Sequence, residues 1–154
     1  MELADILLPD AILAGAKATS KKRALQDASL LAQDVYQLPA KEILTALQDR
    51  ELLGPTGMGH GVAIPHARLP MIDRVWGLFL RLDKPVDFNA VDRQPVDLVF
   101  VLFAPEGAVA DHLKALALVS RTLRDEAICA KLRSTDDPSA IYSILTGNLK
   151  SKAA

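Results

Sequence analysis

The chain has 154 residues, the size of one compact domain, and its composition is that of a globular protein, with 50% hydrophobic and 24% charged residues. Lys and Arg total 18 against 19 for Asp and Glu, so the chain lacks the basic excess of a dedicated nucleic-acid-binding protein. We expect a single domain over residues 1–154, with an ordered core over about residues 3–148 and a frayed tail from Lys150 to Ala154.

The sequence also argues against secretion and membrane insertion. The single cysteine, Cys129, excludes an intramolecular disulfide and suits a reducing cytoplasm. The N-terminus carries Glu2 and Asp5 where a secretory signal needs a basic start and then an apolar run. The longest uncharged apolar stretch in the middle of the chain, residues 98–104, falls far short of the ~20 residues that cross a bilayer. A cytoplasmic location is therefore expected.

In chain order, the first third predicts a short strand and two helices. Residues 12–13 are the candidate strand, and Ser20 is a suitable N-cap for the first helix. The apolar positions that follow at helical spacing are Leu25, Ala28, Leu31 or Ala32, and Val35. Pro39 suits the first turn of the second helix and Gly54 its end, so Arg50 falls in the last turn.

Residues 54–61 are rich in glycine: half of the eight glycines of the chain fall in this window. They are Gly54, Gly57, Gly59 and Gly61. A short apolar run at residues 62–64 follows and ends at Pro65. Because the residue before a proline is pushed toward extended backbone, this region predicts a glycine loop, a short strand and an abrupt end.

The second half of the chain predicts the rest of the sheet. Residues 75–82 and 96–103 are rich in Val, Leu and Phe, as buried strands are, and an edge hairpin is expected around residues 86–88. Helices and strands therefore interleave along the chain. The expected fold is α/β, with a mixed parallel and antiparallel sheet of about five strands sandwiched between helices on both faces.

Three further helices complete the pattern. The first begins near Asp111. Its expected apolar face consists of Leu113, Leu116, Ala117 and Leu123, with Ser120 small enough to join it. Asp125 and either Asp136 or Asp137 are suitable N-caps for two closing helices.

The chain holds three histidines, His60, His66 and His112. His66 follows the predicted strand at residues 61–64, and His112 lies in the first turn of the helix after the predicted strand at residues 96–103. Ligands of open α/β sheets gather beyond the carboxyl ends of the strands. The two imidazoles therefore converge if these strands are parallel neighbours.

A neutral imidazole in such a place is a competent nucleophile near neutral pH, and toward a phosphoryl group it would form a phosphohistidine. A helix N-terminus and the amides of the glycine loop would stabilise the negative charge of that group. Arg50 would add a charge-assisted contact if the second helix ends beside the loop. Positioning and electrostatics do most of the work in phosphoryl transfer, so these few groups suffice.

Each feature alone also has an ordinary structural explanation. A histidine beside a proline is usually structural or exposed, His112 could be a simple helix-start residue, and the glycines could form only a tight turn. The basic residues 21–23 are interpreted as a solvated helix start and Cys129 as a core residue. A metal site is poorly supported because no two histidines have the i, i+4 spacing, and the G-x-S-x-G motif of serine hydrolases does not occur.

Residues 54–66, GPTGMGHGVAIPH, resemble the active-site signature of the enzyme IIA components of the fructose/mannitol class in the bacterial phosphotransferase system. Residues 50–51, 94–98 and 111–113 match the same family, and the resemblance covers nearly the whole chain. Residues 20–25 are most similar to the nitrogen-related branch of the family. The resemblance implies a mixed sheet flanked by helices, in agreement with the fold expected from the patterns.

The same resemblance implies roles for three residues. His66 would receive a phosphoryl group from a phosphohistidine on an HPr-like carrier protein, and Arg50 and His112 would bind and orient that group. Neither a cofactor nor a metal is implied. The loop residues expected near the site are Thr56, Gly57, Gly59, His60 and Gly61. In the nitrogen-related branch, the phosphorylation state chiefly regulates potassium transport and sensor or metabolic proteins.

Three positions depart from the family pattern. His60 stands where the family usually has Asn, which would bring a third imidazole near the site or merely exchange one polar side chain for another. Pro55 stands where Ser is common, which removes a hydroxyl and a backbone donor from the loop. Arg68 replaces a frequent Lys two positions after His66 and keeps its charge.

Three functions stay open from the sequence. The first is a regulatory phosphocarrier, favoured by residues 20–25 and by the free-standing single domain. The second is a sugar-specific IIA component that passes the phosphoryl group to a IIB domain for fructose/mannitol-type uptake. The third, from another class, is a non-catalytic module of the same fold that binds an anion or a metal ion in the histidine cleft. A nucleic-acid partner is not expected.

Overall fold

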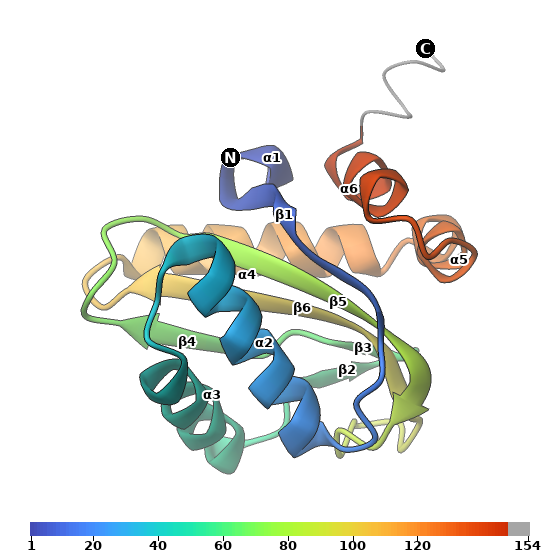
Figure 1. Ribbon diagram of the computed structural model, residues 1–154, viewed down its shortest axis with the longest axis horizontal. Helices are drawn as coiled ribbons and strands as arrows, with labels where there is room; N and C mark the ends of the chain where they lie inside the picture. Colours follow the sequence, from blue (N-terminus) through green and yellow to red (C-terminus); the bar gives the residue numbers. More distant parts are fainter. Residues whose placement is uncertain (148–154) are drawn as a thin grey trace.

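The computed structural model describes residues 1–147, whose backbone forms a mixed six-stranded sheet with helices on both faces (Figure 1). The strands are β1 (Leu7–Ala16), β2 (Gly57–Gly59), β3 (Val62–Ala63), β4 (His66–Leu69), β5 (Trp76–Val86) and β6 (Val96–Pro105). The helices are α1 (Leu3–Ile6), α2 (Lys21–Tyr36), α3 (Ala40–Leu53), α4 (Val109–Leu123), α5 (Glu126–Arg133) and α6 (Pro138–Thr146). The expected α/β fold with a mixed sheet is confirmed. The expected tail lies outside the described residues.

The strand order places β6 in the middle of the sheet. Neighbouring strands follow the order β1-β5-β6-β3-β2, and β4 also pairs with β6. β5 is antiparallel to β6, whereas β1 is parallel to β5 and both β3 and β4 are parallel to β6. Val62 is paired with Leu98 and His66 with Leu102, so β3 and β4 follow one another along the same edge of β6. His66 therefore lies beside the C-terminal half of β6.

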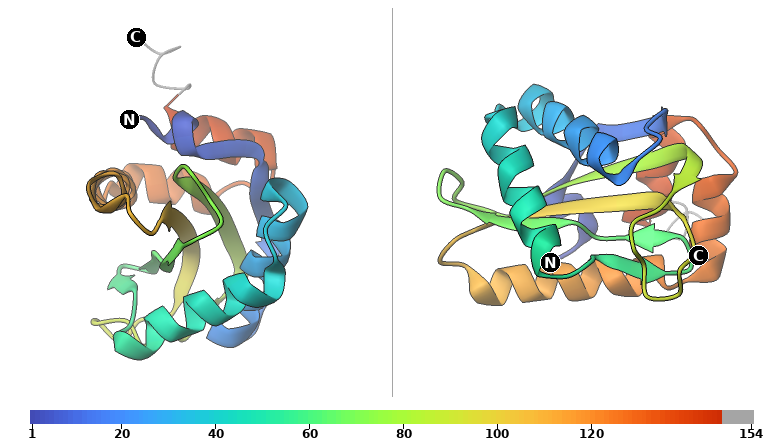
Figure 2. Two further views of the ribbon diagram at one scale, coloured as in Figure 1. Left: turned by 90° about the vertical axis from the view of Figure 1, so that its left-hand side faces the viewer. Right: turned by 90° about the horizontal axis from the view of Figure 1, so that it is seen from below.

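Helices α2 and α3 cover one face of the sheet and α4 covers the other, as the side view in Figure 2 shows. α2 packs on β1 and β5, α3 packs on β4, and α4 packs on β6. α6 packs on β1 and contacts α5. Because both faces are covered, β6 is buried along nearly its whole length, which is typical of a central strand.

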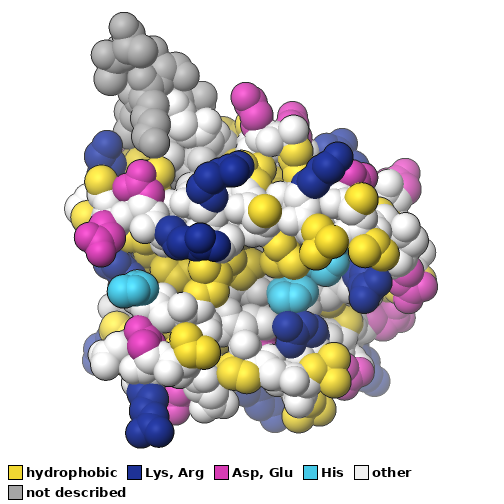
Figure 3. Space-filling view, turned by 180° about the vertical axis from the view of Figure 1, so that it is seen from behind, with side chains coloured by type: hydrophobic (Ala, Val, Ile, Leu, Met, Phe, Trp, Pro, Cys, Tyr) yellow, Lys and Arg dark blue, Asp and Glu magenta, His cyan; other side chains and the backbone are white. Residues whose placement is uncertain are grey.

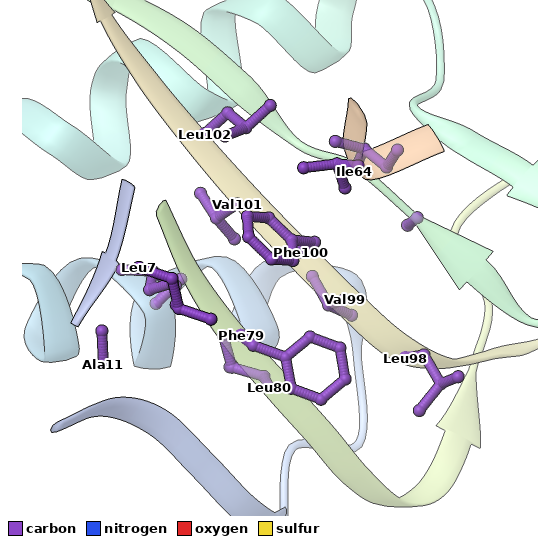
Figure 4. Packing of buried hydrophobic residues seen from close by; sticks show 14 of the residues in the cluster. Leu7, Ala11, Ile64, Phe79, Leu80, Leu98, Val99, Phe100, Val101 and Leu102 are labelled. Carbon is purple, nitrogen blue, oxygen red and sulfur yellow. The ribbon is translucent and has the colours of Figure 1, made fainter. Parts of the chain in front are cut away.

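The side chains of β5 and β6 form the centre of the hydrophobic core (Figure 4). Phe79 and Phe100 are paired directly across the two strands, with their ring centroids 6.2 Å apart, and both are fully buried. Burying a side chain of this size contributes roughly 1.5–3 kcal/mol to stability. The strand that carries His66 is thus hydrogen-bonded to a strand that the core holds on both faces.

Most of the local signals for helix ends are confirmed, but Pro39, expected in the first turn of the second helix, is the extended N-cap residue that precedes α3. Ser20 precedes α2, and its Oγ accepts a hydrogen bond from a backbone N–H of the first turn at 3.1 Å. Gly54 follows the last residue of α3. Asp125 and Asp137 cap α5 and α6, each by accepting hydrogen bonds from backbone N–H groups of the first turn. These signals depend on residues only a few positions apart, which is why the sequence alone reveals them.

The short elements differ from the expectation. α1, β2 and β4 have at most four residues, too few to show a period in the sequence. The strand expected at residues 12–13 is part of the longer β1. The strand expected at residues 61–64 forms only as β3, and His66 begins β4 after the break at Pro65, which has no N–H to donate. The hairpin expected around residues 86–88 is the connection from β5 to β6 itself.

The buried face of α4 also differs from the expected one. Leu113, expected in the core, is 62% exposed, and Ala117 is exposed as well. The buried residues of α4 are His112, Ala115, Val119 and Leu123. The helix carries two overlapping apolar stripes, and its packing on β6, a contact distant in sequence, decides which of them is buried. Of the expected face, Leu123 is buried as predicted and Leu116 packs partly buried against the core, so only Leu113 and Ala117 face solvent.

Candidate functional site

His66, the first residue of β4, is half-buried on a backbone that is fixed to β6. The carbonyl oxygen of the preceding Pro65 accepts a hydrogen bond from the N–H of Leu102 at 3.0 Å. The Nδ1 atom of His66 lies 2.8 Å from the carbonyl oxygen of Ile64. Because a carbonyl oxygen can only accept, Nδ1 carries the proton and Nε2 keeps the lone pair. The ring therefore presents an unprotonated nitrogen on the side away from its own backbone.

Arg50, in the last turn of α3, faces this nitrogen. Its Nε lies 3.2 Å from Nε2 of His66, and its Nη1 donates to the carbonyl oxygen of Gly54 at 2.9 Å. The end of the helix thus holds the guanidinium against the imidazole. The pKa of His66 lies below its usual range, chiefly because burial disfavours the charged ring, and the positive charges of Arg50 and Arg68 act in the same direction. His66 is therefore neutral near neutral pH.

His112, in the first turn of α4, meets His66 edge-on, with ring centroids 5.3 Å apart and ring planes at 70°. The rings converge because His66 pairs with β6 and His112 follows the same strand in the chain. Burial lowers the pKa of His112 to about 4, and the charges of His66, Arg68 and Arg50 add to the effect. The Nε2 atom of His112 is buried and has no hydrogen-bond partner among residues 1–147. Such an orphaned atom is uncommon in folded proteins.

A buried carboxylate fixes the start of the glycine loop. Glu51 accepts a hydrogen bond from the backbone N–H of Thr56 at 3.2 Å and a second one from the Thr56 hydroxyl. The Nζ of Lys21 lies 2.6 Å from the same carboxylate, and the side chains of Lys21 and Glu51 are only 19% and 7% exposed. The sequence suggested that Lys21 belongs to a solvated helix start, and for this residue the suggestion is wrong. Its ion pair with Glu51 links α2 to α3 and to the loop. Because Glu51 lies 30 positions away, no pattern in the sequence around Lys21 reveals this pair.

The residues of the glycine loop divide between two surface hollows. Thr56 and Gly57 line one hollow together with Arg50 and His66. Gly59, next along the loop, lines a neighbouring hollow. The loop residues grouped by the sequence motif therefore do not all reach the histidine pair.

His60 lies at the turn between β2 and β3 and lines the second hollow, not that of His66. Its φ of +56° is a left-handed conformation in which Asn and His are enriched, so the exchange of Asn for His suits this backbone. Its N–H donates to Asp92 at 2.9 Å, and its carbonyl oxygen accepts from Arg133 at 2.9 Å. At the adjacent Gly61, with φ +79°, an added Cβ would lie 2.5 Å from the same Arg133 side chain.

The hollow beside His66 is basic and partly apolar. Its lining consists of Arg50, Pro55, Thr56, Gly57, Met58, Ile64, His66, Leu116, Ala117, Ser120, Arg121 and Arg124. Figure 3 shows histidine side chains within a band of hydrophobic surface, with basic side chains above and below it. A neutral imidazole with a free lone pair in basic surroundings suits an anionic electrophile such as a phosphoryl group.

Other kinds of site find less support in the described part of the chain. Within residues 1–147, no group of three or more His, Cys, Asp or Glu side chains is arranged to hold a metal ion. No helix of this same range has the length and the apolar character needed to span a membrane. Cys129 is buried, its Sγ lies 3.2 Å from the carbonyl oxygen of Leu123, and burial raises the pKa of its thiol. Cys129 is a core residue, as expected.

Comparisons with known sequences identify the family to which the chain belongs. Residues 5–148 match the family model described as the phosphoenolpyruvate-dependent sugar phosphotransferase system, EIIA 2. The chain is 51% identical over 145 residues to the nitrogen regulatory protein of Bradyrhizobium diazoefficiens, an alignment that covers 94% of this chain and 95% of the relative. Both matches extend over almost the entire chain, including the site.

Solved structures agree with these matches. The nitrogen regulatory protein IIA-Ntr of Neisseria meningitidis superposes with a TM-score of 0.88 at 35% identity, covering 94% of this chain and 99% of that one. Enzyme IIAMTL of Escherichia coli, solved in complex with phosphorylated enzyme IIBMTL, shares the fold with a TM-score of 0.76 at 22% identity, covering 90% and 95%. The chain therefore belongs to the EIIA 2 family of the phosphoenolpyruvate-dependent sugar phosphotransferase system, as a phosphocarrier component of its nitrogen-related branch.

Proposed function

We propose that His66 is the phosphoryl acceptor and that its Nε2 takes the group. The observation that carries this proposal is the Nδ1–H bond to the carbonyl oxygen of Ile64, which leaves the Nε2 lone pair beside Arg50. Nε2 attacks the phosphorus in line, so that a new N–P bond forms while the N–P bond of the donor breaks. The donor imidazole leaves with that electron pair, and Nδ1 of His66 keeps its proton.

Arg50 and His112 are the proposed ligands of the phosphoryl oxygens. The guanidinium of Arg50 already contacts Nε2, so it can make a charge-assisted hydrogen bond to a group attached there. The buried Nε2 of His112 lacks a partner among residues 1–147, and a phosphoryl oxygen would supply one. The added negative charge favours protonation of His112, and a protonated imidazole donates from both of its nitrogens.

The proposed donor is a phosphohistidine on an HPr-like carrier protein, as the family resemblance implies. Relatives over nearly the full length carry the name nitrogen regulatory protein. We therefore propose that the phosphorylation state of His66 regulates target proteins in the cytoplasm, such as those of potassium transport or sensor proteins. In this role the phosphoryl group is a signal, so slow loss of the group matters more than rapid turnover.

Phosphorylation in a defined mixture tests the acceptor. Incubation with phosphoenolpyruvate, a matching enzyme I and an HPr-like carrier should add one acid-labile phosphoryl group, measured by intact-protein mass spectrometry. His66→Ala should stay unmodified, whereas His60→Ala, a matched exchange in the same loop, should be modified like the wild type. A wild-type chain that stays unmodified, while the same carriers phosphorylate another acceptor, would contradict the proposal.

Passage of the group to a IIB domain is the second candidate function. It is worth testing because the same fold occurs in enzyme IIAMTL bound to phosphorylated IIBMTL. The labelled phosphorylated chain is mixed with IIB domains of the fructose/mannitol class, and the label is followed by gel electrophoresis. Rapid movement of the label onto IIB would favour sugar uptake, and retention on His66 would favour the regulatory role.

A further inference from the structure

Thr56, which directly precedes β2, is held at each of its polar groups. Its backbone N–H and its hydroxyl both donate to the carboxylate of Glu51. Its carbonyl oxygen accepts a hydrogen bond from the N–H of Ile64 at 3.1 Å. A threonine has only these two donors, so Thr56 has none left for a phosphoryl group, although it lines the hollow of His66. Any role of Thr56 at the site is therefore indirect.

Ile64, the residue bound to Thr56, also contacts the imidazole of His66. Its N–H donates to Thr56 on the side away from β6, and its carbonyl oxygen lies 2.8 Å from Nδ1 of His66. β3 ends one residue earlier, at Ala63, and Pro65 has no N–H to donate. On this side of the strand, the bond to Thr56 therefore supports the carbonyl group that orients the ring.

Two consecutive residues of α3 thus reach the two ring nitrogens of His66. Arg50 contacts Nε2 directly, with its Nε at 3.2 Å. Glu51 reaches Nδ1 through two intermediate residues, Thr56 and Ile64. The end of one helix therefore holds the imidazole from both sides.

Stabilisation of the fold explains only part of this arrangement. The side chains of the Lys21–Glu51 pair are largely shielded, and replacing a buried ion pair by apolar residues is often neutral or stabilising. Packing of α2 on α3 therefore does not require a carboxylate at this place. An ionised carboxylate only accepts hydrogen bonds and has several lone pairs, so it can serve Lys21 and both donors of Thr56 at once.

We propose that Glu51 and Thr56 are positioning residues of the phosphoryl transfer: through Ile64 they hold the carbonyl oxygen that keeps the proton of His66 on Nδ1 and the lone pair on Nε2. The inference rests on the proposed function, and it adds two residues that act on the ring without touching the phosphoryl group. The partner of one ring nitrogen decides which tautomer a histidine adopts. If the carbonyl oxygen shifts, the bond to Nδ1 weakens and the proton can move to Nε2, which then has no lone pair for the phosphorus.

Thr56→Val and Glu51→Gln test the inference, because the first removes the hydroxyl and the second removes the carboxylate. Thr122→Val is the matched control: the half-buried Thr122 also donates its hydroxyl to a backbone carbonyl oxygen, and it does not line the hollow of His66. Thermal unfolding by circular dichroism checks that each variant folds.

Transfer from the phosphorylated carrier is followed by rapid quench at several donor concentrations. The rate at saturating donor should fall about 10-fold in Thr56→Val and in Glu51→Gln, as is usual when a histidine loses the support of its second nitrogen. The donor concentration that gives half of the maximal rate should stay near the wild-type value. Thr56→Ser, which keeps the hydroxyl, should recover most of the rate, and Thr122→Val should behave like the wild type.

The tautomer of His66 is a second measurement, which a loss of stability alone does not change. Two-bond ¹H–¹⁵N correlation spectra at about pH 8, above the ordinary imidazole pKa of about 6.5, show which ring nitrogen carries the proton. The spectrum of His66→Ala identifies the signals of His66. In the wild type the proton should be on Nδ1, whereas Thr56→Val and Glu51→Gln should show a mixture of the two tautomers.

Wild-type rates in both variants, or a wild-type tautomer in both, would overturn the inference. An equal loss of rate in Thr122→Val would also overturn it, as would a change only in the donor concentration needed, since that outcome places Thr56 and Glu51 in donor binding. A wild type that accepts no phosphoryl group overturns the proposed function instead. The tautomer comparison then still decides whether Glu51 and Thr56 orient the ring.

Discussion

The α3 side and the α4 side of the histidine pair are built differently. On the α3 side, side chains are tied to the backbone and to each other: Arg50 bonds to Gly54, and Glu51 bonds to Thr56 and Lys21. On the α4 side, Nε2 of His112 is buried without a partner among residues 1–147. The first side is preorganised, so it costs little to use in a reaction. The second side keeps unmet hydrogen-bonding capacity that an incoming group can satisfy.

Arg50→Gln tests the preorganised side and should have the largest effect. Loss of one preorganised donor from beside Nε2 should slow phosphoryl transfer to His66 about 10²–10³-fold. Arg50→Lys keeps the charge without the two-point contact, so it should recover only part of the rate. Single-turnover measurements at saturating donor separate this effect from docking. A wild-type rate in Arg50→Gln would remove the guanidinium from the mechanism.

The buried imidazole of His112 should make the stability of the protein depend on pH. The pKa of His112 is about 4 in the native state and about 6.5 when unfolded, so the unfolded chain binds the proton first as the pH falls. The free energy of unfolding should therefore decline between about pH 6.5 and about pH 4, by up to about 3 kcal/mol, with no contribution from this group at higher pH. Urea unfolding of wild type and His112→Asn across this range measures it. Identical slopes would rule out His112 as the source.

Glu51→Gln tests how much the carboxylate of Glu51 contributes to stability. The substitution leaves the charge of Lys21 largely shielded and without its partner, so the free energy of unfolding should fall by about 2 kcal/mol. Asp27→Asn is the control, because Asp27 pairs with Arg23, whose side chain is 62% exposed, so that this i, i+4 pair should be worth only about 0.5 kcal/mol. Urea denaturation measures both, and equal effects would mean that the Lys21–Glu51 pair contributes no more than a surface pair.

Gly57→Ala should have the smallest effect of the four. A Cβ added at Gly57 would lie 2.8 Å from the Cβ of Ala90 and 2.9 Å from its Cα, so the loop would have to shift, at a cost of about 1–2 kcal/mol. At Gly107 nothing lies within 4 Å of an added Cβ, so Gly107→Ala should leave stability nearly unchanged. Thermal unfolding of the two variants compares them. Equal stability of the two variants would show that the loop at Gly57 tolerates the added Cβ.

The parts of the fold that the sequence predicts are those set by neighbouring residues. Ser20 and Asp125 cap their helices because each side chain reaches an amide only two or three positions away. The order of long helices and strands follows from apolar periods that span many residues. β4 escapes prediction because its four residues become a strand only by pairing with β6.

The candidate site divides in the same way. Residues 54–66 carry a local motif that points to His66, and the geometry then brings Arg50 and His112 to it. The link between Lys21 and Glu51, and the rotation of α4 that exposes Leu113, depend on tertiary packing. No period or motif within one segment encodes such contacts, so they require the three-dimensional structure.

The pairing of β4 with β6 limits how the state of His66 can be sensed. The ring of His66 projects from the short strand β4, which pairs with the largely buried strand β6 through Leu102 and its neighbours. A backbone held in this way has little freedom to swing when a charged group arrives on the ring. A partner that distinguishes a phosphorylated from an unmodified His66 is therefore expected to contact the surface around the imidazole and to respond directly to its altered charge and shape.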